Sequence, residues 1–169
     1  MKTLSVRTVA SMGLLFALAI VLSFLEHLIP SLVPTVPGIK LGLSNIVTMY
    51  ALFYMGFSSA LTIVGLKSLF VFLMRGATAC FLSLAGGLLS LLIMAGLHRL
   101  FRGKLSALFL SVVGGVCHNL GQVLVASILL NVYVFLYLPV LLIVGVVMGL
   151  ITGKLLQIVL PAMRRIARK

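Results

Sequence analysis

Long apolar runs, separated by short polar or proline-rich segments, make up most of the chain. A helix needs about 20 predominantly apolar residues to cross the hydrocarbon core of a bilayer. The first run ends at a segment with three prolines, Pro30 to Gly38, which cannot continue a helix. A later run ends at the basic loop from His98 to Lys104. The pattern predicts six membrane-spanning helices, which cover residues 8–29, 41–57, 58–74, 78–97, 105–130 and 139–160.

Composition narrows the class of protein further. Hydrophobic residues make up 63% of the sequence and charged residues only 8%, a balance that leaves a water-soluble fold without a polar surface. The six predicted spans use about three quarters of the 169 residues, and the rest forms short connections and the two ends. We therefore expect an all-α integral membrane protein with a single transmembrane domain, residues 1–169, built as a six-helix bundle.

The distribution of cations predicts the orientation of this bundle. With six crossings, both chain ends share one side of the membrane with the fourth-to-fifth loop. That side collects nine basic residues, which are Lys2, Arg7, Arg99, Arg102, Lys104, Arg164, Arg165, Arg168 and Lys169. The opposite side receives only Lys40 and Arg75. By the positive-inside rule both termini are cytoplasmic, in a bacterial cell membrane. The net charge of +12 is then explained by topology signals and anionic lipid contacts, and nucleic-acid binding is not expected.

The sequence carries no recognisable catalytic constellation. Glu26 is the only acidic residue, which excludes paired-carboxylate catalysis, a Ser-His-Asp triad and an aspartate-rich magnesium site. Cys80 and Cys117 lie far apart within predicted spans and have no metal-type spacing with the histidines. We expect no metal, no cofactor and no enzyme activity of this chain by itself.

Polar residues that interrupt the apolar runs are the candidate site. Each is costly in lipid and should therefore face the bundle interior or water. In the predicted topology the following all lie in the outward half: Glu26, Lys40, Asn45, Lys67, Arg75, His118, Asn119 and Gln122. Only Glu26 is available to balance Lys40, Lys67 and Arg75, so the predicted substrate is a small anionic molecule that carries carboxylate or phosphate.

Six of these eight residues also have a structural interpretation. Lys67 could extend along its helix to the outer interface, and Arg75 could be an interface anchor. His118 could be a satisfied core histidine, while Asn119 and Gln122 could join helices by hydrogen bonds. Glu26 could simply pair with a cation. The sequence leaves both sets of interpretations open.

Small residues recur at helical spacing on two predicted spans. Ala10, Gly13 and Ala17 form a smooth strip on the cytoplasmic half of the first span, which predicts a surface for close contact with a partner helix. Three glycines repeat every four residues from Gly145 to Gly153, and packing within the bundle is the favoured interpretation for these.

Several stretches resemble a known membrane family. They are Arg7 to Glu26, Pro37 to Asn45, Phe81 to Ser90, His118 to Gln122 and Gly149 to Gly153. Together they resemble the family described as heptaprenyl diphosphate synthase component I, also called the Gx transporter family. That family in turn resembles the substrate-binding S components of energy-coupling factor (ECF) transporters.

The resemblance to S components implies a specific fold and specific partners. S components have six helices, bind a small nutrient from outside, and assemble with a coupling transmembrane protein and two ATPase subunits. They contact the coupling protein through an AxxxA strip on the first helix. Gly13 and Ala17 match this strip, with glycine in place of its first alanine.

Three functions follow from these observations. The first is an S-component-like subunit that takes up a small anionic solute from the outer side. The alternative is a non-catalytic component I, associated with a polyprenyl diphosphate synthase, that holds or passes a prenyl diphosphate. The third is a purely structural membrane subunit, whose polar groups only join helices.

Overall fold

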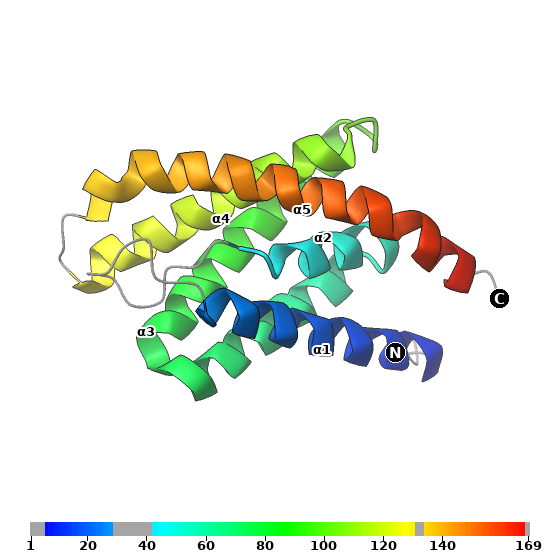
Figure 1. Cartoon of the computed structure of the whole chain (residues 1–169), viewed down its shortest axis with the longest axis horizontal. Helices are drawn as coiled ribbons and strands as arrows, with labels where there is room; N and C mark the ends of the chain where they lie inside the picture. The colour runs from blue at the N-terminus through cyan, green and yellow to red at the C-terminus, as the bar shows by residue number, and fades with distance from the viewer. Residues whose placement is uncertain (1–5, 29–41, 131–133, 168–169) are drawn as a thin grey trace.

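Five α-helices and one short 3₁₀ helix form the described part of a computed structural model, which covers residues 6–28, 42–130 and 134–167. The elements in chain order are α1 (Val6–Leu28), α2 (Asn45–Tyr54), α3 (Phe57–Leu100), α4 (Ala107–Leu130), η1 (Val134–Tyr137) and α5 (Leu138–Ala167). These residues include no strand. The helices lie side by side with their axes along the long dimension of the molecule (Figure 1). The predicted all-α class is confirmed.

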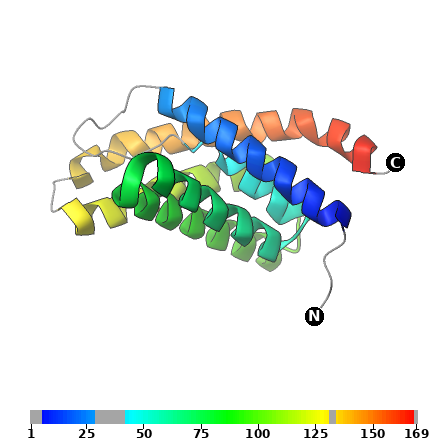
Figure 2. The same ribbon diagram turned by 90° about the horizontal axis from the view of Figure 1, so that it is seen from below.

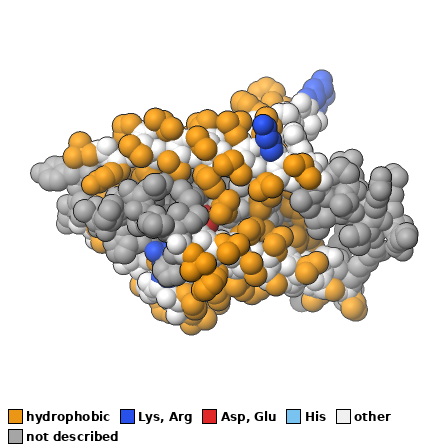
Figure 3. Space-filling model, in the orientation of Figure 1, with side chains coloured by type: hydrophobic (Ala, Val, Ile, Leu, Met, Phe, Trp, Pro, Cys, Tyr) orange, Lys and Arg blue, Asp and Glu red, His pale blue; other side chains and the backbone are white. Residues whose placement is uncertain are grey.

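Four of these segments are long and apolar enough to cross a membrane, namely Thr8–Glu26, Phe57–Leu100, Ala107–Leu130 and Val134–Ile158. Large hydrophobic side chains are exposed along them, such as Leu73 at 74% and Ile128 at 76%. Hydrophobic side chains cover much of the described surface in Figure 3. Among the described residues, fourteen polar or charged side chains are buried. An apolar outside with polar groups inside is compatible with a protein embedded in lipid.

The predicted count of six separate helices is not confirmed, because the predicted spans 58–74 and 78–97 belong to the single element α3. Gly76 interrupts this element with φ 82° and ψ −177°, a backbone conformation that is essentially restricted to glycine. The chain reverses there, so that the two limbs lie side by side (Figure 2). The Ser68 hydroxyl donates to the Ser83 hydroxyl across the limbs at 3.5 Å. The predicted break thus exists, as a sharp reversal at one glycine.

The predicted span 41–57 is wrong in its extent. Helix α2 has only ten residues, which at 1.5 Å per residue is about half of the thickness of a bilayer core. It begins after a turn at Gly42, where φ is 89° and the carbonyl accepts a hydrogen bond from the Asn45 N–H at 2.9 Å. In Figure 1, α2 starts near the middle of the bundle. The positive end of a half-length helix therefore lies inside the molecule.

Helices α4 and α5 pack closely through glycines, as predicted for the repeat from Gly145 to Gly153. A Cβ added at Gly149 would lie 2.5 Å from the Cα of Val112, and one at Gly145 would lie 3.0 Å from the carbonyl oxygen of Gly115. Real Cβ atoms essentially never come within 3.0 Å of another heavy atom, so Gly149 has no room for a side chain, and Gly145 lies at this limit. The packing interpretation of these glycines is confirmed.

The first residues of α1, the last residues of α5 and the turn between α3 and α4 lie at the same end of the molecule (Figure 1). The α3 reversal, the end of α4 and the short helix η1 are at the opposite end. This arrangement agrees with two termini on one side of a membrane. Which side that is remains a prediction.

Candidate functional site

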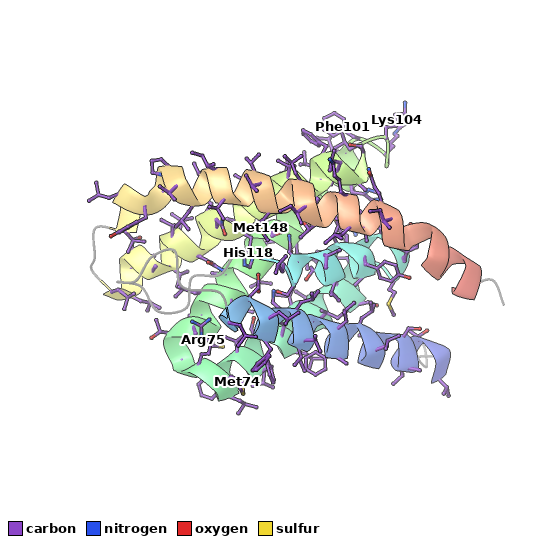
Figure 4. All side chains as sticks on the ribbon, in the orientation of Figure 1. Met74, Arg75, Phe101, Lys104, His118 and Met148 are labelled. Carbon is purple, nitrogen blue, oxygen red and sulfur yellow. The ribbon has the colours of Figure 1, made fainter. Side chains whose placement is uncertain are left out.

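Buried polar side chains from four helices lie inside the bundle, and hydrogen bonds join several of them in pairs. We call this group the polar cluster, and its members are Glu26, Ser44, Asn45, Lys67, Ser90, His118 and Gln122. None of them is more than 5% exposed. Helix α1 contributes the carboxylate, the start of α2 a hydroxyl and an amide, α3 the ammonium and a second hydroxyl, and α4 the imidazole and a second amide. Figure 4 shows His118 near the centre of the molecule.

Lys67 points into the protein. Its side chain is 2% exposed, and its ammonium donates a hydrogen bond to the Ser44 hydroxyl at 3.2 Å. It also interacts electrostatically with Glu26. A buried ammonium needs both a counter-charge and hydrogen-bond acceptors to offset its lost hydration. The structure supplies both inside the bundle, so Lys67 does not extend to the membrane surface.

Glu26 connects the end of α1 with the start of α2. Its carboxylate accepts a hydrogen bond from the N–H of Leu43, which immediately precedes Ser44 and helix α2. The N-terminus of a helix carries partial positive charge and N–H groups that have no partner within the helix. Glu26 therefore accepts the Leu43 N–H just before α2, near the positive end of that helix, while it balances Lys67.

The polar side chains of α4 form hydrogen bonds both within the helix and to α5. His118 and Gln122 are one turn apart and join through their Nε2 atoms at 2.8 Å. Because the amide nitrogen only donates, the Nε2 atom of His118 accepts in this arrangement. Asn119 instead donates to the carbonyl of Leu141 on α5 at 2.6 Å. Asn119 thus has the predicted alternative role of joining helices.

Two glycines form the space that His118 occupies. A Cβ added at Gly86 on α3 would lie 2.8 Å from the imidazole Nδ1, and one at Gly42 would lie 3.3 Å from its Cδ2. His118 is therefore fitted closely between the second limb of α3 and the turn before α2. The Gly86-Gly87 pair was visible in the sequence, but nothing there connected it with the histidine.

The structure does not place every predicted site residue in the cluster. Arg75 is half-buried beside the Gly76 reversal, and Figure 4 shows it at the end of the bundle, apart from His118. Lys40 lies outside the described residues. Of the three basic residues in the predicted site, only Lys67 is found in the polar cluster, as far as the structure describes the chain.

Three buried hydroxyl residues in or beside the polar cluster were not among the predicted binding residues, namely Ser44, Ser90 and Thr48. Ser90 links to Asn45, whose amide nitrogen donates to the Ser90 hydroxyl at 3.1 Å. The hydroxyl of Thr48, a fully buried residue, has no hydrogen-bond partner among the described residues. Serine and threonine are common in membrane helices, where they can bond to their own backbone, so neither carried a distinctive signal.

The predicted partner strip on α1 is open. Ala10, Gly13 and Ala17 are all exposed, and a Cβ added at Gly13 would meet no atom within 4 Å. Packing within the described part of this chain does not use this strip. Its role in contact with another protein stays a prediction.

Together these features define a class, a membrane-embedded helical bundle with a buried, charge-compensated polar cluster. A sequence model of the family described as heptaprenyl diphosphate synthase component I matches residues 15–159. The match covers most of the chain, and the protein belongs to this family. No curated protein and no solved structure matches the chain.

The family match tests several of the predictions made from the sequence. It confirms the family, whereas the further resemblance to S components of ECF transporters is not confirmed. The description is of one component of a synthase, which supports the prediction that this chain is not an enzyme by itself. It also agrees with the alternative function better than with the transporter function.

Proposed function

We propose that this protein is a non-catalytic membrane component of a polyprenyl diphosphate synthase, and that its polar cluster binds the diphosphate end of a prenyl substrate or product. The family match over residues 15–159 carries the proposal. The chemistry of the ligand supports it as well. A prenyl diphosphate has an apolar chain, which a bilayer accommodates, and a polyanionic end, which a buried cation such as Lys67 attracts.

The catalytic part belongs to a partner in this proposal. Ionising a prenyl diphosphate requires neutralisation of its leaving group, for which carboxylate-bound magnesium is suited. The chain has no aspartate and only one glutamate, and that glutamate interacts with Lys67. This component would hold or deliver the ligand at the membrane, and a separate synthase subunit would form the new carbon–carbon bond.

Co-expression with the catalytic synthase subunit tests this function. The tagged chain, extracted in mild detergent, should retain the synthase subunit and increase its rate of prenyl chain elongation. Lys67→Met should reduce the increase while the two proteins still co-purify. Lys154→Met, which changes an exposed lysine on α5, is the matched control. Loss of the synthase subunit during purification, together with an unchanged rate, would contradict the proposal.

A second candidate is a substrate-binding subunit of an ECF-type transporter that takes up a small anionic solute. The open strip of Ala10, Gly13 and Ala17 on α1 favours it, since close helix contact with a coupling transmembrane protein requires such a surface. ATPase subunits would supply the energy. Here the purified protein should retain a small water-soluble molecule, detected by mass spectrometry. Gly13→Leu should block assembly with the coupling protein and spare binding of that molecule.

A further inference from the structure

The carboxylate of Glu26 lies where several positive features of the polar cluster meet. It accepts the Leu43 N–H at the start of α2 and interacts with the buried ammonium of Lys67. The start of α2 adds the partial positive charge of a helix N-terminus. This combination of backbone N–H, helix N-terminus and ammonium is the usual composition of a phosphate-binding site. In this structure, a side chain of the protein itself fills that position.

The chain has no other acidic side chain that could take this role. Lys67 is 2% exposed and lies well inside α3, so a nearby anion offsets the lost hydration of its ammonium form. While Lys67 is protonated, the cluster is more stable with a negative group, which is either Glu26 or an anion that replaces it.

We infer that Glu26 is the resident anion of a buried phosphate site, and that a diphosphate binds by displacing the Glu26 carboxylate from Leu43 and Lys67. The inference rests on the ligand class of the proposed function, but it does not require the synthase partner. It assigns Glu26 as a competitor of the ligand, whereas the sequence suggested a direct contact with it.

Position along the helices makes Glu26 the mobile member of the pair. Glu26 is the last residue of the apolar segment Thr8–Glu26, so a change of side-chain rotamer can carry its carboxylate toward the membrane interface. Lys67 lies two to three turns from the Gly76 reversal and would remain in place.

A second observation also indicates room for hydrogen bonding to a ligand. Thr48 is four residues after Ser44, and both therefore lie on the same face of α2. The Thr48 hydroxyl is fully buried and has no hydrogen-bond partner among the described residues, although the neighbouring Ser44 hydroxyl accepts from Lys67. An oxygen of a bound diphosphate would supply the missing acceptor.

Calorimetric titration of the full chain in detergent micelles with inorganic diphosphate tests the inference. An internal competitor lowers the apparent affinity, because only the fraction of molecules in which it is displaced can bind the ligand. Glu26→Gln should therefore bind diphosphate about tenfold or more tightly than the wild type. The double variant Glu26→Gln with Lys67→Met should lose this gain. Lys154→Met should match the wild type. Equal or weaker binding by Glu26→Gln, or no binding by either protein, overturns the inference.

The wild-type protein offers an independent measurement that needs no substitution. A water-soluble carbodiimide modifies accessible carboxylates, and Glu26 is the only acidic side chain. Mass spectrometry of the Glu26 peptide should show little modification without diphosphate and several-fold more at saturation. Unchanged or decreased modification contradicts displacement. Neither result depends on the synthase experiment, so the two proposals can fail separately.

Discussion

At the scale of single residues, the polar cluster is held by close contacts around His118 and by one compensated charge pair. The sequence identified Glu26, Asn45, Lys67, His118 and Gln122 because polar groups in lipid are costly and must face the interior. It grouped Arg75 with them because depth was counted along the predicted spans. Whether two residues meet depends on where the chain turns, and hydropathy alone does not show this.

Gly86 should not tolerate a side chain. In Gly86→Ala, the new methyl would lie 2.7 Å from the His118 carbonyl oxygen and 2.8 Å from its Nδ1 atom. We expect a loss of about 1–3 kcal/mol of stability, the usual cost of overpacking. Gly96→Ala is the matched control, because Gly96 lies on the same limb of α3 with no atom within 4 Å of an added Cβ. Thermal unfolding in detergent should show destabilisation of the first variant only.

Removal of Lys67 should destabilise the fold more than removal of both charges. Lys67→Met removes the ammonium partner of the Glu26 carboxylate, and the loss of one partner of a buried pair costs up to about 3–5 kcal/mol when the other stays buried. Adding Glu26→Gln to Lys67→Met removes the remaining charge and should recover most of this loss. A double-mutant cycle from chemical unfolding measures the coupling. Additive losses in the two single variants would show that the residues do not act as a pair.

At the scale of elements, the positions of the long helices followed from hydropathy, and the short ones did not. The predicted spans 8–29 and 105–130 are close to α1 (Val6–Leu28) and α4 (Ala107–Leu130). The error at α2 has a physical cause. Residues such as Val47 and Met49 are apolar because they are buried against protein, each 1% exposed, and hydropathy does not distinguish contact with protein from contact with lipid.

The reversal within α3 should depend on glycine at position 76. Its φ of 82° and ψ of −177° are strained for any residue with a Cβ, at a typical cost of about 1–3 kcal/mol. No atom lies within 4 Å of a Cβ added at Gly76, so the loss in Gly76→Ala would come from the backbone alone. Gly65→Ala, at an equally open position within the first limb of α3, is the control. Comparable melting temperatures for the two variants would mean that the limbs can join in another way.

At the scale of the whole molecule, the arrangement of its two ends predicts the orientation in the membrane. The turn from Phe101 to Ser106 contains Arg102 and Lys104 and lies at the same end as the start of α1 and the end of α5 (Figure 1). Helix η1 is at the opposite end, with Leu136 exposed at 77%. By the positive-inside rule, the basic end should face the cytoplasm.

Thiol labelling of intact cells tests this orientation. In a background with Cys80→Ala and Cys117→Ala, a membrane-impermeant maleimide should label Leu136→Cys and leave Lys104→Cys unlabelled until the membrane is opened. The expected difference follows from the opposite ends that the two positions occupy, because the reagent reaches only outer water. The reverse labelling pattern would place the basic end of the bundle outside the cell and would contradict the predicted orientation.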